Sequence, residues 1–108
     1  MRRGHTEILT LRAAGDSEFL VFPDADIQGV MISSYDGGTA WNGGAVATKG
    51  TLNPSAVDTP TAATWKTLAG SAADISGGVG IIIDPWSAIH FDAASYTAGQ
   101  LVVEVKPF

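Results

Sequence analysis

The carboxyl-terminal residues of the chain alternate between polar and apolar side chains. From Gln100 to Lys106 every second residue is apolar, and Val102 is the one exception. Successive side chains of a strand point to opposite faces, so this pattern is typical of a strand with one buried and one solvated face. The run therefore predicts a β-strand over 100–106.

The remaining apolar runs are also short, and glycine and proline separate them. The chain of 108 residues contains 13 glycines and 5 prolines, a proportion typical of proteins in which tight turns join strands. No apolar stripe with the helical period extends over ten residues, and only one helical turn is expected, around Ser71–Asp74. The predicted strands cover 6–12, 17–22, 28–34, 44–52, 64–68, 79–83, 86–91 and 100–106.

Eight short strands predict an all-β fold, an antiparallel β-sandwich or a jelly-roll-like barrel. We expect a single domain over 1–108, with residues 1–5 as a flexible or docking arm. The alternating positions predict a core of Leu9, Leu11, Leu20, Phe22, Val30, Ile32, Val46, Leu68, Ile81, Ile83, Ile89, Phe91, Leu101, Val103 and Val105.

Composition argues against several classes of partner. The net charge is −5, whereas phosphate backbones need a basic face, so nucleic acid is not an expected partner. Cysteine is absent, which excludes disulfides, thiolate metal sites and thiol nucleophiles. No apolar run approaches the ~20 residues that span a bilayer, and no hydrophobic segment follows the basic amino terminus, so neither a membrane nor a signal peptide is expected.

The polar residues form no catalytic constellation. His90 lies between two apolar residues of a predicted strand and is interpreted as a packed histidine. Asp24 and Asp26 form an Asp-x-Asp pair after Pro23, and Asp36 precedes two glycines. Aspartate commonly stabilises turns at such positions, although calcium also favours oxygen-rich loops. We expect no enzymatic activity, no cofactor and no metal.

Three tryptophans and two apolar runs are candidates for contacts with other molecules. Trp41 lies in a glycine-rich loop and is a candidate stacking platform for a sugar or an anchor in a protein interface, whereas Trp65 and Trp86 are interpreted as core or rim residues. The runs 19–22 and 81–83 are apolar on both faces. Such strands are either covered on both sides or face a partner, so we expect a homo-oligomer, with a trimer favoured.

Four segments carry a resemblance to a known family: Gly44-Ala-Val-Ala-Thr48, Thr64-Trp-Lys-Thr-Leu68, Ser87-Ala-Ile-His-Phe91 and Gln100-Leu-Val-Val-Glu-Val105. In this order, with a proline-rich loop before the second and a glycine-rich turn after it, they resemble small β-sandwich virion proteins of tailed bacteriophages. Such proteins decorate or cement capsids, or form collars, fastening elements and fibre bases.

The resemblance implies a non-enzymatic virion structural protein, foremost a capsid decoration (cement) protein that binds and stabilises the phage head. The implied partner is the major capsid protein or another virion protein, and the implied location is the capsid surface after assembly in the host cytoplasm. Arg2 and Arg3 would reach an acidic patch on the shell, while Trp41 and the 53–63 loop, with Pro54 and Pro60, would contact a neighbouring subunit.

Two alternatives stay open. The chain could be a tail or fibre accessory protein. It could also be a carbohydrate-binding module in which Trp41 is the platform and Asp24, Asp26 or Asp36 accept hydrogen bonds.

Overall fold

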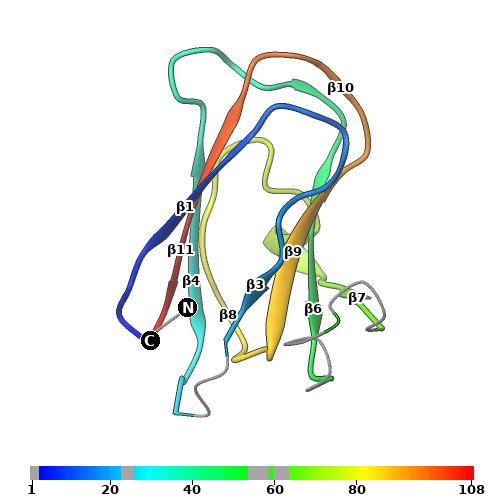
Figure 1. Ribbon diagram of the computed structural model, residues 1–108. Helices are drawn as coiled ribbons and strands as arrows, with labels where there is room; N and C mark the ends of the chain where they lie inside the picture. The colour runs from blue at the N-terminus through cyan, green and yellow to red at the C-terminus, as the bar shows by residue number, and fades with distance from the viewer. Residues whose placement is uncertain (1–2, 23–25, 54–58, 60–63) are drawn as a thin grey trace.

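Two antiparallel sheets pack face to face (Figure 1). The computed structural model describes residues 3–22, 26–53, 59 and 64–108. The first sheet has the order β1 (Glu7–Leu11), β11 (Leu101–Pro107), β4 (Val30–Tyr35) and β8 (Gly80–Ile83). In the second sheet β9 (Ala88–Ala93) pairs with β6 (Val46–Thr51), β2 (Gly15–Asp16) and β3 (Leu20–Val21), and β6 also pairs with β7 (Lys66–Thr67).

A short pair, β5 (Asn42–Gly43) with β10 (Tyr96–Ala98), lies at one end of the sandwich (Figure 1). One 3-10 turn, η3 (Gly70–Ala73), follows β7 and confirms the helical turn expected around Ser71–Asp74. The prediction of an all-β sandwich is confirmed. Both large sheets have edge strands, so the structure is a sandwich and not a closed barrel.

Six of the eight predicted strands match observed strands to within a few residues, namely β1, β4, β6, β8, β9 and β11. The predictions over 17–22 and 64–68 were too long, because pairing occurs only at Leu20–Val21 and Lys66–Thr67. The short strands β2, β5 and β10 were not predicted. A two- or three-residue ladder depends on where a partner strand lies, and the local apolar pattern does not contain that information.

The alternation that predicted the last strand has the expected structural consequence. Val103 and Val105 of β11 point into the core, whereas Lys106 is exposed. Val102 lies on the outer face and yet is only 9% exposed. The turn at Gly37 covers it, since a Cβ atom on Gly37 would lie 2.9 Å from Val102 Cγ2. Val102, the exception in the alternating pattern, is therefore buried outside the main core, beneath this turn.

The core fills the space between the two sheets. Twelve of the fifteen predicted core residues are buried, whereas Leu11, Ile81 and Ile83 lie partly buried at its margin. The prediction missed Ile27 and Ile75. Ile75 is fully buried although it follows η3 in a segment expected to be a loop, because its N–H donates to Val46 O and its carbonyl accepts from Ser34 Oγ at 2.7 Å.

Asp74 fastens this loop to the second sheet. Its Oδ1 atom accepts hydrogen bonds from Ser76 Oγ at 2.6 Å, Ser76 N at 3.0 Å and Val46 N at 3.1 Å. These bonds, foremost the one from the Ser76 hydroxyl, lower the pKa of Asp74 below its ordinary value. The loop between β7 and β8 is thus held by charge-assisted bonds as well as by the Ile75 side chain.

The amino-terminal segment lies beside the end of the chain. Gly4 N donates to Pro107 O at 2.7 Å, so the described part of the expected arm, 3–5, starts next to the end of β11. All three of its residues are exposed. Across the described ranges, no helix is long and apolar enough to cross a membrane.

Candidate functional site

The outer face of the first sheet exposes four large apolar or aromatic side chains, which we call the apolar face: Ile8, Met31, Tyr35 and Ile82. Their exposed fractions are 59%, 41%, 44% and 65%. Among the described residues only one other large hydrophobic side chain, Leu52, is comparably exposed. Exposed apolar side chains scattered singly are ordinary, whereas a group gathered on one face marks an interaction surface.

Strand register explains how the apolar face is shaped. Met31 of β4 lies opposite Ile82 of β8, so these two side chains are neighbours on the face. The next row across the sheet contains Ser33 and Gly80, which are short. An open hollow of about 550 Å³ forms there. Its outward-facing lining consists of Thr6, Met31, Ser33, Gly80, Ile82, Glu104 and Lys106.

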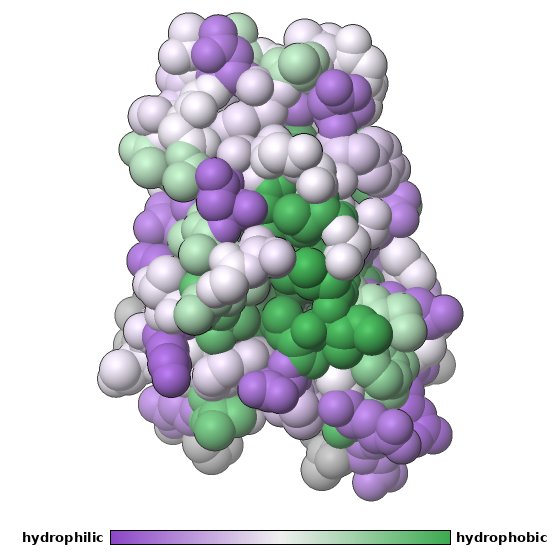
Figure 2. All heavy atoms as spheres, turned by 180° about the vertical axis from the view of Figure 1, so that it is seen from behind, coloured by the Kyte–Doolittle hydropathy of each residue, from purple (hydrophilic) through white to green (hydrophobic). Residues whose placement is uncertain are grey.

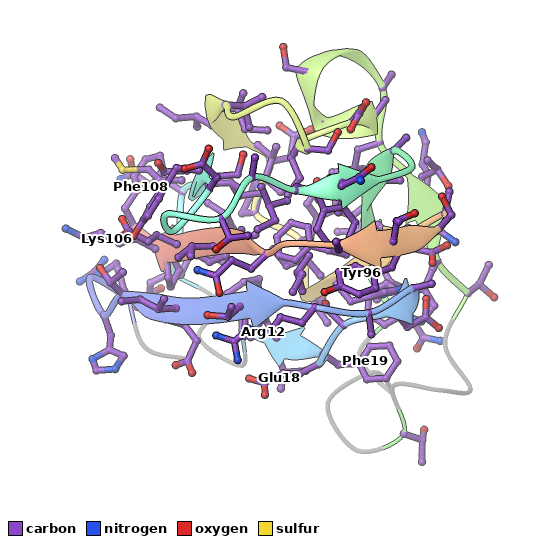
Figure 3. All side chains as sticks on the ribbon, turned by 90° about the horizontal axis from the view of Figure 1, so that it is seen from above. Arg12, Glu18, Phe19, Tyr96, Lys106 and Phe108 are labelled. Atoms are coloured by element: carbon purple, nitrogen blue, oxygen red, sulfur yellow. The ribbon has the colours of Figure 1, made fainter. Side chains whose placement is uncertain are left out.

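Charged and polar groups border this hollow. Tyr35 Oη donates to Glu104 Oε1 at 2.8 Å, and this bond to a carboxylate raises the pKa of Tyr35. Lys106 points outward from the end of β11 (Figure 3). An apolar centre with a polar border is the usual composition of a protein interface.

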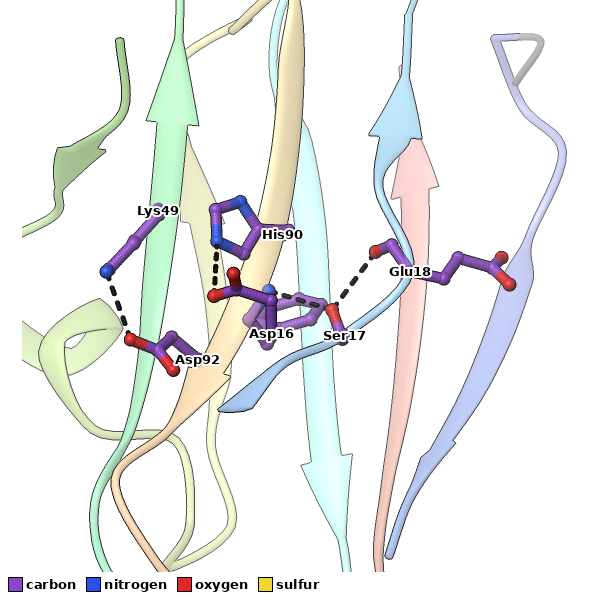
Figure 4. Close-up of polar contacts among 7 residues, drawn as sticks. Asp16, Ser17, Glu18, Lys49, His90 and Asp92 are labelled. Atoms are coloured by element: carbon purple, nitrogen blue, oxygen red, sulfur yellow. Dashed lines mark hydrogen bonds and ion pairs between the residues drawn. The ribbon is translucent and has the colours of Figure 1, made fainter. Parts of the chain in front are cut away.

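The second sheet carries a buried histidine on its outer side (Figure 4). His90 is 2% exposed because the rings of Phe19 and Trp65 cover it, with centroid distances of 4.9 and 4.4 Å. Phe19 and Trp65 also stack on each other. Burial is the largest cause that lowers the pKa of His90 below 6.5. The interpretation of His90 as a packed residue is confirmed.

The polar contacts around His90 do not align a nucleophile. Its Nε2–H donates to Asp16 Oδ1 at 3.2 Å, since a carboxylate accepts and does not donate. The nearby Ser17 hydroxyl donates to Glu18 O at 3.0 Å and accepts from Phe91 N at 2.9 Å (Figure 4). Both of its hydrogen bonds are therefore made with backbone groups. This cluster packs and positions side chains.

Trp41 is half-buried at the end of the sandwich near β5 and β10. Its Nε1–H donates to Gly44 O at 3.0 Å, and its ring lies 5.3 Å from that of Tyr96. One edge of Trp41 borders an open hollow of about 330 Å³ together with Tyr35 and Asp36. The structure thus brings Trp41 and Asp36 together, whereas Asp26 lies outside this hollow.

None of the other predicted site residues that the structure describes lies in the hollow beside Trp41. Arg3 is exposed and precedes Gly4, whose N–H donates to Pro107 O at the end of β11, and it does not line the hollow beside Trp41. Arg2, Pro54, Pro60 and Asp24 lie outside the described residues. Within the described ranges, no group of three or more histidine or carboxylate side chains could hold a metal ion.

Sequence reasoning missed most of the apolar face. The apolar 81–83 run pointed to Ile82, but Ile8, Met31 and Tyr35 were not singled out. Ile8 and Met31 are apolar residues at positions where the strand alternation predicts a polar, outward side chain. That mismatch is the signal in the sequence that would have identified them.

Comparisons with protein-family models, with curated proteins and with solved structures find no match for this chain.

Proposed function

We propose that this chain is a non-enzymatic structural protein that binds other proteins, and that it acts as a capsid decoration protein of a tailed bacteriophage. The observation that supports a docking role is the apolar face, with Ile8, Met31, Tyr35 and Ile82 exposed on one side of the first sheet. Two of these side chains, Met31 and Ile82, line the hollow of about 550 Å³. Burying such a surface stabilises a complex by roughly 25 cal/mol for each Å² removed from water. The virion assignment itself rests on the resemblance of the four sequence segments.

In this proposal the partner is the major capsid protein or another virion protein. Glu104 and Lys106 at the border of the hollow favour one orientation of the partner, because mismatched charges are costly at an interface. Arg3, exposed at the end of β11, adds a cation that reaches an acidic patch. Many copies on one shell would stabilise it jointly, since each repeated contact contributes.

Met31→Lys tests the proposal, with Leu52→Lys as its matched control. Both residues are exposed, but only Met31 lies on the apolar face. Purified variants are added to phage capsids assembled without the chain, and bound protein is measured after sedimentation. We expect Met31→Lys to lower occupancy at least about tenfold, which corresponds to about 1.4 kcal/mol. Leu52→Lys should bind like the unmodified chain. Equal binding by both variants would reject the apolar face as the docking surface.

The amino-terminal arm is tested separately by deleting residues 1–5. We expect weaker capsid binding with an unchanged unfolding temperature, since the described residues of this segment are exposed. Unchanged occupancy would remove the arm from the mechanism.

A carbohydrate-binding role is the second candidate, and the hollow beside Trp41 favours it. An aromatic ring next to a carboxylate and a tyrosine offers a stacking surface and hydrogen-bond acceptors for a sugar. Glycans are titrated while tryptophan fluorescence is recorded, with Trp41→Phe and Trp65→Phe as test and control variants. A saturable change that Trp41→Phe removes and Trp65→Phe retains would support this role. A flat titration would contradict it.

A further inference from the structure

Strand β8 is the least protected edge in the described part of the molecule. Natural sheets blunt their edges with charge, proline, bulges or very short strands. The edge strand β7 has two residues and carries Lys66, and the edge strand β1 carries Glu7. In contrast, β8 is Gly80-Ile-Ile-Ile83, without a charged residue or a proline, and its pairing with β4 is regular.

Strand register shows which main-chain groups of β8 face outward. Ser34 N donates to Val79 O, so the Ser34–Val79 pair is hydrogen-bonded. Bonded and non-bonded pairs alternate along an antiparallel ladder. Ile81 and Ile83 therefore bond to β4, whereas the N–H and C=O groups of Gly80 and Ile82 point away from the sheet. No described residue bonds to these outward groups.

The surface beside this edge is apolar and open. Viewed from behind, one continuous apolar patch occupies the middle of the molecule, on the side where β8 lies (Figure 2). Two hollows, of about 280 and 350 Å³, separate β8 from η3 and β7. Both are lined by Ile82, Ile83 and Ala72. The side chain of Ile82, 65% exposed, thus belongs to the apolar face and also lies at the open edge.

We infer that the free edge of β8 pairs with β8 of a second copy of this chain, antiparallel and around a two-fold axis. With Ile81 opposite Ile81 of the second copy, each Gly80 faces Ile82 of the other copy. These pairs carry the outward N–H and C=O groups and exchange two hydrogen bonds each. The two four-stranded sheets then form one continuous sheet. This inference does not depend on the proposed capsid function.

The uncharged sequence of β8 is compatible with a second copy as the occupant. The net charge of −5 opposes self-association in general. In this register, however, each Asp84 faces Gly78 of the other copy, and the two carboxylates lie about 20 Å apart along the ladder. That separation exceeds the ~8 Å screening length at physiological salt. Two copies of the edge can therefore approach without repulsion between these carboxylates, and the outward N–H and C=O groups of one copy match those of the other because the register is symmetric.

Symmetry predicts a dimer in place of the trimer favoured by the sequence. A two-fold interface uses the same patch on both copies and closes after two subunits. Four-residue pairing is a small interface, so we expect a dissociation constant on the order of micromolar.

Ile82→Lys and Ile8→Lys form the test pair for the dimer. Both isoleucines are exposed on the outer face of the first sheet, but they lie on its opposite edge strands, β8 and β1. Light scattering on the size-exclusion peak is recorded over at least a tenfold range of concentration. We expect the unmodified chain and Ile8→Lys to approach the mass of a dimer, and Ile82→Lys to stay monomeric with an unchanged circular dichroism spectrum. A monomer at all concentrations, a trimer, or a dimeric Ile82→Lys would overturn the inference.

Amide hydrogen exchange, measured by NMR, tests the strand pairing directly. In the dimer the Gly80 and Ile82 amides should exchange slowly, and dilution should accelerate their exchange at least about tenfold. The Ile81 and Ile83 amides are internal controls, because they bond to β4 in the monomer as well. Fast exchange at Gly80 and Ile82 in a dimer would show that another surface holds the copies together, and would reject β8 pairing.

Discussion

His90 Nε2 donates a hydrogen bond to Asp16 across 3.2 Å, while Nδ1 of the same ring is buried without a partner among the described residues. The two side chains differ sharply in exposure, with 3% for His90 and 58% for Asp16. The histidine ring is thus buried under Phe19 and Trp65, whereas the carboxylate to which it donates is exposed to solvent. Its protonation would place a charge beneath Phe19 and Trp65.

Acidification should destabilise the protein through His90. Its pKa is lowered in the folded state from 6.5, because burial and the nearby Lys49 outweigh the attraction of Asp16 and Asp92. The unfolded chain then binds more protons below pH 6.5, so the free energy of unfolding decreases as the pH falls through and below this value. Urea unfolding curves measured between about pH 5 and 7.5 give this slope.

His90→Gln keeps a side-chain donor near Asp16 and removes the titration. We expect its free energy of unfolding to depend less on pH than that of the unmodified chain in the same interval. His5→Gln, which alters the exposed histidine, should keep the original slope. If His90→Gln retained the full pH dependence, another group would have to carry it.

Thr48→Val should stabilise the fold. Thr48 is fully buried between the sheets, and its Oγ1 atom has no hydrogen-bond partner within the described residues. Valine has nearly the same shape and removes the desolvated hydroxyl, so the free energy of unfolding should increase by about 1 kcal/mol. Thermal and urea unfolding measure the change.

Thr51→Val is the matched control. Thr51 is also buried, but its Oγ1 atom accepts a hydrogen bond from Asn53 N at 3.1 Å. The control should lower the free energy of unfolding by about 1 kcal/mol, because the donor loses its partner. Destabilisation by both substitutions would show that the Thr48 hydroxyl has a partner in solution.

Gly50→Ala should destabilise the contact between β6 and Trp86. A Cβ atom at Gly50 would lie 2.6 Å from Cδ2 of the Trp86 ring, which is too close for a real contact. Displacing the indole should cost about 1–3 kcal/mol of unfolding free energy. Gly77→Ala, at a position with open space and no positive φ, should change it by less than about 0.5 kcal/mol. Equal effects of the two substitutions would contradict this packing.

The face that each strand buries could be predicted where the strand is long. The alternation in 100–106 and 28–34 places Val103 and Ile32 in the core, and both are buried. Period-two patterns are local, and a slip by one residue would expose every buried side chain of the strand. The all-β class and most of the core followed from this rule alone.

The tertiary structure decided the features that depend on which segments meet. In the segment predicted as a strand over 17–22, only Leu20 and Val21 pair with β9. Ile75 lies in the core because Ser34 and Val46, which are distant in sequence, form hydrogen bonds with its backbone. The apolar face arises in the same way, since Met31 and Ile82 are distant in sequence and become neighbours only through the β4–β8 register. Alternation along one strand assigns side chains to two faces, whereas the order of the strands, set by long-range pairing, determines which side chains share a surface and which edge is left open.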